Sequence, residues 1–204
     1  MPQPSHISAL GVPDPGTLDD DLKTIWAKCV EKLGFVPNVY STYSKRPQRL
    51  RNFMAMYNEI MYAPSGLSKL EREMIAVVVS SANRCYYCLV AHGAAVRQLS
   101  GDPELGEMMA LNYRVAKLDA RQRALLDFAW KMTTTPHLVD DGDREGLRGH
   151  GLSEEDIFDL AETTAFFNLS NRMASATDMM PNAEYHRADR GAPFVPPAPK
   201  PRKG

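Results

Sequence analysis

The chain has 204 residues, of which 44% are hydrophobic and 24% charged, and its formal net charge is -1. This balance is typical of a globular protein, and the length suits one domain rather than two. The near-zero charge argues against nucleic-acid binding, because proteins of that class usually present a basic face to the phosphates. No stretch resembles a membrane span or a signal peptide, so we expect a cytoplasmic protein without a membrane partner.

Both ends of the sequence are rich in proline, which interrupts regular helices. Four prolines fall within the first 15 residues, and five fall within the closing stretch GAPFVPPAPKPRKG. We therefore predict tails at 1–17 and 188–204 on either side of a single helical domain at 18–187. The C-terminal tail is expected to be an extended, solvated segment.

The first half of the predicted domain contains three helical segments. The segment 18–33 has aspartates in its first turn and is followed by Gly34, which is a typical helix stop. A short helical turn is expected at 38–44. A long helix is expected over 47–64, because it lies between two prolines and carries apolar residues at helical spacing.

The next helix, LEREMIAVVVSSAN at 70–83, has an unusual middle that is apolar on nearly every side. Ser68 and Glu71 fit a capping box that starts the helix. A helix of this kind has to be buried all round, either at the centre of a bundle or at a contact between subunits.

The second half of the domain also shows helical patterns and no alternation typical of a strand. We predict helices at 85–99, 103–113, 119–135 and 153–180. A stretch rich in Asp, Gly and Arg at 139–151 is expected to be a flexible loop. The fold class is therefore all-α, with a single domain of about seven helices.

Two of the three cysteines share one face of the helix expected at 85–99 with a histidine. At 3.6 residues per turn, Cys85, Cys88 and His92 fall within a sector of about 100°, whereas Tyr86 and Tyr87 point elsewhere. The imidazole can accept a thiol proton or stabilise a thiolate, and the nearby helix N-terminus favours an anion. A peroxide could then oxidise one thiolate to a sulfenic acid, which the other cysteine would trap as a disulfide.

Glu73 is harder to explain as a structural residue, because its neighbours on the preceding and following turns are largely apolar. A carboxylate in such surroundings costs free energy unless it is hydrogen-bonded or paired with a charge. A buried histidine on the next helix is the natural partner, so we expect Glu73 to orient His92 and to raise its basicity.

These residues stand in the order Glu-x11-Cys-x2-Cys-x3-His, namely Glu73, Cys85, Cys88 and His92. The arrangement resembles the alkylhydroperoxidase D (AhpD) core. The surrounding LSKLEREMIAVVVSSANRCYYCLVAHGAAV and the later FFNLSNRMASA resemble the peroxidase-related branch of the carboxymuconolactone decarboxylase-like superfamily. The resemblance covers about residues 18–187 and is strongest at 65–100.

The resemblance implies an AhpD-like helical domain that assembles into trimers or hexamers and reduces small organic hydroperoxides with no metal or cofactor. It implies that Cys88 attacks the peroxide, that Cys85 resolves the product, and that His92 and Glu73 relay protons. A partner protein or a small dithiol would restore the reduced pair. AhpD has a further histidine between its cysteines, where this sequence has Tyr87, so we expect a shorter proton relay.

Other functions are compatible with the same residues. A disulfide oxidoreductase or redox sensor with little peroxidase activity would fit the change to Tyr87. A zinc-stabilised interaction protein would use Cys85, Cys88 and His92 as ligands, although a structural zinc takes four and no fourth Cys or His is near in the sequence. Decarboxylation of a lactone, the reaction of the superfamily's namesake, gives no reason for a cysteine pair.

We assign no chemistry to the remaining candidates. Cys29 is expected to be a buried free thiol on the first helix. Surface positions are expected for the other four histidines, which are His6, His137, His150 and His186. A structural role explains three polar residues of the last helix as well as a site would, and these are Asn168, Asn171 and Arg172.

Overall fold

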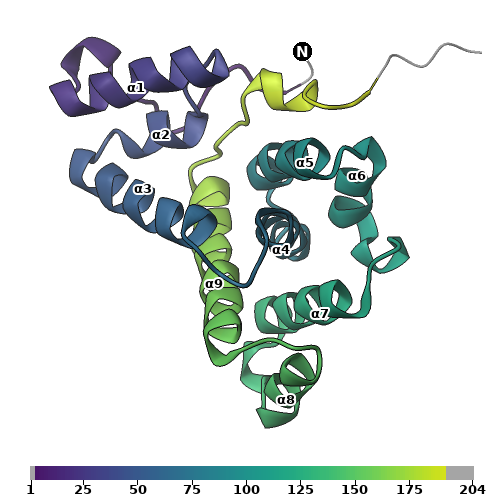
Figure 1. Cartoon of the computed structure of the whole chain (residues 1–204). Helices are drawn as coiled ribbons and strands as arrows, with labels where there is room; N and C mark the ends of the chain where they lie inside the picture. The colour runs from purple at the N-terminus through teal and green to yellow at the C-terminus, as the bar shows by residue number, and fades with distance from the viewer. Residues whose placement is uncertain (1–2, 192–204) are drawn as a thin grey trace, which may run out of the picture.

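A computed structural model describes residues 3–191. Within that range the chain forms nine α-helices and four short 3₁₀-helices and contains no β-strand (Figure 1), as the all-α prediction requires. None of these helices is long and apolar enough to cross a membrane. The α-helices are α1 (Asp20–Leu33), α2 (Asn38–Tyr43), α3 (Pro47–Tyr62), α4 (Lys69–Ala82), α5 (Tyr86–Ser100), α6 (Pro103–Asn112), α7 (Ala120–Thr134), α8 (Asp141–Gly149) and α9 (Glu154–Ala176), and the 3₁₀-helices are η1 (Pro15–Thr17), η2 (Tyr113–Val115), η3 (Pro136–Leu138) and η4 (Ala183–His186).

Helix α4 is the centre of the structure. It packs against α5, α6, α7 and α9, which surround it in Figure 1. Every residue from Glu71 to Ser80 is buried, so the burial predicted from its apolar middle is confirmed. The helix therefore lies at the centre of a bundle formed by a single chain, and any polar side chain on it needs a partner inside that bundle.

Helices α1 to α3 lie to one side of this bundle, where α3 contacts both α9 and α4. They enclose a small core of their own, in which Leu18, Leu22 and Leu50 are buried. Gly34 ends α1 in the left-handed conformation at a φ of 81°, as its position in the sequence predicted.

The segment before α1 runs beside the C-terminal end of α9. The N–H of Ala9 donates to the carbonyl of Thr177, and the N–H of Met180 donates to the carbonyl of Ile7, both at 3.0 Å. These bonds hold the two ends of the described chain together. The C-terminal tail predicted at 188–204 lies outside the described residues from residue 192 onward.

The prediction of a flexible loop at 139–151 is wrong, because most of this stretch forms α8. A capping box starts the helix, with the Asp140 carboxylate accepting from the Asp143 N–H and the Asp143 carboxylate accepting from the Asp140 N–H. Lys131 of α7 pairs with Asp143 at 2.6 Å, and Leu147 is buried. These tertiary contacts and the cap override the low helix propensity of the three glycines in α8.

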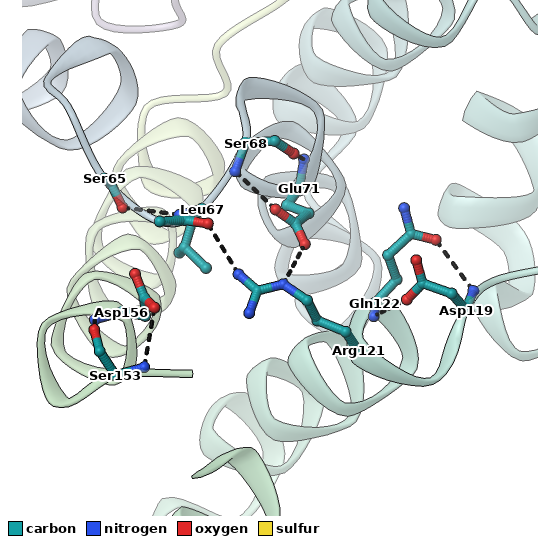
Figure 2. A network of polar contacts seen from close by, with 10 residues as sticks. Ser65, Leu67, Ser68, Glu71, Asp119, Arg121, Gln122, Ser153 and Asp156 are labelled. Carbon is teal, nitrogen blue, oxygen red and sulfur yellow. Dashed lines mark hydrogen bonds and ion pairs between the residues drawn. The ribbon is translucent and has the colours of Figure 1, made fainter. Parts of the chain in front are cut away.

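The start of α4 is joined to α7 by a polar network, beside which lies the cap of α9 (Figure 2). Ser68 and Glu71 form the predicted capping box, at 2.7 Å and 3.2 Å. The other oxygen of the buried Glu71 carboxylate accepts from Arg121 Nε of α7 at 3.1 Å, and Arg121 also donates to the carbonyl of Gly66. A Cβ on Gly66 would lie 2.0 Å from the Asp156 carboxylate of α9, so any larger residue would displace that carboxylate from its hydrogen bond with the N–H of Ser153.

We predict that Arg121→Ala lowers the free energy of unfolding by about 1–3 kcal/mol, because it leaves the buried Glu71 carboxylate without its charged partner. Urea denaturation measures the change. The matched control is Arg144→Ala, which removes an exposed pair with Asp141 and should cost less than about 0.5 kcal/mol. Equal losses in the two variants would show that the Glu71 contact does not stabilise the bundle.

Candidate redox site

The chain turns sharply between α4 and α5, and this turn positions Cys85. Arg84 has a φ of 53°, and the extended Cys85 caps α5, which begins at Tyr86. The N–H of Cys85 donates to the carbonyl of Ser80 at 2.9 Å. Cys85 therefore precedes the helix instead of lying in its first turn, and its side chain faces the helix N-terminus.

Both cysteine side chains of the pair are buried, each with 1% of its surface exposed. They form a small cluster with Tyr87 and with two residues from the C-terminal end of α9 and beyond, Ala174 and Met179. Both thiols are free. Cys85 and Cys88 thus face the interior of the molecule, where only a small molecule can reach them without a local rearrangement.

Tyr87 does not point away from the cysteines, as its position on a helical wheel suggested, but belongs to the same buried cluster. Its hydroxyl accepts the N–H of Val39 at 3.1 Å and so holds the start of α2. Burial raises the pKa of Tyr87 well above its ordinary value. At neutral pH this side chain is a fixed phenol, which replaces the histidine that AhpD has between its cysteines.

Glu73 and His92 form the contact expected between α4 and α5. Glu73 Oε2 lies 2.6 Å from His92 Nδ1, and the two side chains are 8% and 13% exposed. Phe167 of α9 meets the imidazole edge-on, with 4.7 Å between the ring centroids. With its Nδ1–H donating to the carboxylate, a neutral His92 has its acceptor at Nε2. The ring is held in one orientation and keeps one nitrogen free to exchange a proton.

A network of side-chain amides supports the cysteines from α9. The buried Asn171 donates through Nδ2 to Ser80 Oγ at 2.9 Å, and its Oδ1 accepts from Asn83 Nδ2 at 3.0 Å. The same Asn83 amide also donates to Asn168. Because both ends of the Asn171 amide have partners, its N–H groups face Ser80 and the cysteines.

Sequence reasoning missed Asn171 and its neighbour Ser170 as site residues. Ser170 Oγ lies 4.0 Å from Cys88 Sγ, and both α9 residues are buried. The signal that could have found them is the placement of polar residues on the side of α9 that also carries Phe166 and Phe167. Buried amides and hydroxyls of this kind need hydrogen-bond partners inside the protein.

The two thiols differ in acidity. The pKa of Cys85 is lowered to about 7, mainly by a hydrogen bond from the Cys88 thiol, against the effect of burial. The backbone N–H of Cys88, the charge of His92 and the Asn171 amide lower this pKa further. The pKa of Cys88 is raised, because Cys88 donates its proton to Cys85, is buried and faces a thiolate. The first proton therefore leaves Cys85.

A cavity of about 240 Å³ opens beside the pair of Glu73 and His92. Tyr87 and Ser170 also line it, and Ser170 connects it to Cys88, which is not itself a lining residue, through the contact of 4.0 Å between Oγ and Sγ. The site therefore combines a dithiol, an oriented imidazole and an adjoining space for a small molecule.

The other candidates lie elsewhere. Cys29 on α1 is partly exposed rather than buried, and partial burial raises the pKa of its thiol. His6 pairs with Asp178 at 2.8 Å, and His186 contacts the hydroxyl of Tyr86. Residues 3–191 contain no group of three or more His, Cys, Asp or Glu side chains with the geometry of a metal site, so the zinc interpretation gains no support.

Two solved structures are similar to this chain over nearly its whole length. An uncharacterized peroxidase-related protein from Silicibacter sp. TM1040 has 58% sequence identity and a TM-score of 0.89, over 93% of this chain and 100% of that one. The chain belongs to the AhpD-like, peroxidase-related proteins of the carboxymuconolactone decarboxylase superfamily. An AhpD-core, peroxidase-related protein from Ralstonia eutropha JMP134 has 44% identity and a TM-score of 0.88, over 93% and 98% of the chains.

The family assignment agrees with the sequence model of the Carboxymuconolactone decarboxylase family, which matches residues 47–129 and so includes all four predicted site residues. The AhpD-like fold is also shared with the debrominase Bmp8, at 21% identity and a TM-score of 0.73, over 90% of this chain and 96% of that one. No protein of curated function matches the sequence.

The lowered pKa of Cys85 leads to a spectroscopic prediction. Thiolate absorbance near 240 nm, followed against pH in a Cys29→Ser background, should rise with a midpoint near pH 7. In Cys88→Ala the midpoint should move upward, because the thiol that donates to Cys85 is gone. A midpoint near the ordinary value of 9.0 in both proteins would contradict the assignment.

Proposed function

We propose that this protein is a cysteine-dependent peroxidase that reduces small organic hydroperoxides through a dithiol–disulfide cycle of Cys85 and Cys88. The observation that carries this proposal is the 2.6 Å contact of Glu73 with His92 beside a buried dithiol whose first pKa is about 7. Membership of the AhpD-like family supports the same reaction class. A cytoplasmic location and a trimeric or hexameric assembly belong to the proposal as well.

The cycle starts with Cys88 as thiol and Cys85 as thiolate, the proton that Cys85 has lost being held at Nε2 of His92. Transfer of the Cys88 proton to Cys85 along their hydrogen bond creates the attacking thiolate, which lies on the side nearer the cavity. The Cys88 sulfur forms a bond to the terminal peroxide oxygen while the O–O bond breaks. His92 gives its proton to the leaving alkoxide, so an alcohol departs and Cys88 becomes a sulfenic acid.

The second step forms the disulfide between Cys85 and Cys88. The Cys85 sulfur attacks the sulfur of the Cys88 sulfenic acid, an S–S bond forms and the S–O bond breaks. The hydroxide that leaves takes the Cys85 proton and departs as water. An external dithiol, either a small molecule or a protein that reaches the pair after a local rearrangement, then reduces the disulfide by thiol–disulfide exchange.

The burial of both cysteines favours this reaction over the alternative of a disulfide oxidoreductase. Exchange with a protein disulfide requires a sulfur that the partner protein can reach. Each cysteine is only 1% exposed, whereas a cavity adjoins the Cys88 side of the pair. A small peroxide suits this geometry better than a protein substrate does.

The proposal predicts that both cysteines of the pair are needed for turnover. Peroxide consumption with dithiothreitol as reductant should be lost in Cys88→Ser and in Cys85→Ser. The matched control is Cys29→Ser, which should turn over like the wild type because Cys29 lies on α1, outside the site. Undiminished turnover in Cys88→Ser would sink the proposal.

The assignment of a joint proton relay predicts a non-additive pair of substitutions. His92→Gln should lower kcat/KM by about 100-fold or more, which is the usual contribution of general acid–base catalysis. Glu73→Gln should have a smaller effect, because this residue acts through His92. The double variant should be no slower than His92→Gln alone. Independent, multiplicative losses would show that the two residues do not work as a unit.

A further inference from the structure

The cavity beside His92 has strongly aromatic walls. Of the 16 residues that line it, eight are Phe or Tyr, whereas Phe, Tyr and Trp make up 8% of the whole chain. They come from segments far apart in the sequence, including Tyr40 of α2, Tyr57 of α3, Phe167 of α9 and Tyr185 of η4. Five separate elements, α2, α3, α5, α9 and η4, therefore contribute rings to one space, and the packing of a single helix does not require such a convergence.

The rings that form the wall already pack in the geometry that aromatic groups prefer. Phe166 and Phe167 meet edge to face at 5.5 Å, and Phe53 packs on Phe166 at 5.3 Å. Phe167 in turn meets the ring of His92. A planar ring placed in the cavity can extend this set by stacked or edge-to-face contacts, which branched alkyl groups do not make.

The charges around the cavity favour a neutral ligand. Among the described residues that line it, the only charged acid is Glu73, and no Lys or Arg is present. Glu73 is already paired with His92. A ligand carrying a carboxylate would lose its hydration with no Lys or Arg to pair with, because the imidazole of His92 is already paired with Glu73, and it would approach that existing carboxylate. Hydroperoxides of free fatty acids are therefore disfavoured.

The size of the cavity limits the ligand further. An apolar cavity of about 150 Å³ holds a benzene molecule. The volume of about 240 Å³ therefore has room for one ring together with a short branched substituent that carries the peroxide.

The cavity also orients such a ligand toward the cysteines. Phe167 and Ser170 are on neighbouring positions of one face of α9, three residues apart, and both line the cavity. Ser170 Oγ lies 4.0 Å from Cys88 Sγ. A ring that rests on Phe166 and Phe167 would extend its substituent past His92 toward Ser170 and the Cys88 sulfur.

We propose that the cavity lined by Tyr57, Phe166, Phe167 and Tyr185 is a binding site for neutral hydroperoxides of a single aromatic ring with a short branched side chain. This inference rests on the proposed function for its chemistry, in which the O–O bond of the bound peroxide breaks, Cys88 gains the oxygen, and the aryl alcohol leaves. Binding of that alcohol requires only the cavity and does not require the peroxidase reaction.

The kinetic test compares three substrates with dithiothreitol as reductant. We expect kcat/KM for cumene hydroperoxide to exceed that for tert-butyl hydroperoxide by about tenfold or more, since the ring adds a buried apolar group. Hydrogen peroxide, which has no group to fill the cavity, should be slower still. Equal kcat/KM values for the three peroxides would overturn the inference while leaving the peroxidase proposal intact.

Ala95→Leu tests the location of the site, because Ala95 of α5 lines the cavity one turn after Ala91 and a leucine there would fill part of it. The ratio of kcat/KM for cumene hydroperoxide to that for hydrogen peroxide should fall by about tenfold. The matched control is Ala55→Leu on the exposed side of α3, which should keep the wild-type ratio. A wild-type ratio in Ala95→Leu would overturn the inference, and turnover of hydrogen peroxide reports that the variant is folded.

A binding measurement separates this inference from the peroxidase proposal. The aryl alcohol 2-phenyl-2-propanol, which is the product of cumene hydroperoxide reduction, can be titrated into the protein and followed by intrinsic tyrosine fluorescence or by calorimetry. Saturable binding that weakens in Ala95→Leu supports the site. If such binding is found but no peroxide is turned over, only the proposed function fails. Absence of saturable binding overturns the site, whatever the turnover measurements show.

Discussion

The contact between Glu73 and His92 is the constraint on which the site depends. Helix α4 is buried on all sides, so a carboxylate on it has to find a partner within the bundle. His92 of α5 is that partner, at 2.6 Å. The contact fixes the rotation of α5 relative to α4, and thereby the direction in which Cys85 and Cys88 face. One hydrogen bond therefore serves both the packing of α4 against α5 and the orientation of the site.

A second set of polar contacts connects the cysteines to α9. Asn171 bridges Ser80 of α4 and Asn83 at the turn before α5, so three elements meet at the dithiol. A buried amide with partners at both ends has one orientation, and its N–H groups can stabilise a thiolate without rearranging. The difference in acidity between the two thiols follows from this arrangement, together with the hydrogen bond between them.

Much of the fold and the main residues of the site could be predicted from local patterns. Glu73 stood out because a carboxylate on an apolar face needs a partner, and the capping box of Ser68 and Glu71 followed from their spacing. Helix α8 was not predicted, because its three glycines lower the local helix propensity and its contacts with α7 exist only after folding. Helical spacing correctly predicted that Cys85 lies near Cys88, but the helix begins one residue later than expected, because the chain turns at Arg84 and leaves Cys85 as the N-cap.

No local sequence pattern was strong enough to predict the contribution of α9 to the site or the existence of the aromatic cavity. Asn171 sits in a helix where capping, interhelical bonding and a surface position are all ordinary explanations for an amide. The rings of the cavity come from five elements, and each ring alone is explained by core packing. Only the tertiary structure brings these groups together. Helical spacing and the family resemblance predicted the candidate residues, whereas the surroundings that set their acidity and access emerged from the packing of α4, α5 and α9.

The central claim is that Cys85 and Cys88 act as one redox pair. Its most direct test is to add one equivalent of cumene hydroperoxide to the fully reduced protein, quench with an alkylating agent and map the cysteines by peptide mass spectrometry. The account predicts one disulfide that joins Cys85 to Cys88, with Cys29 alkylated. Recovery of both cysteines in alkylated form after the peroxide has been consumed would contradict it.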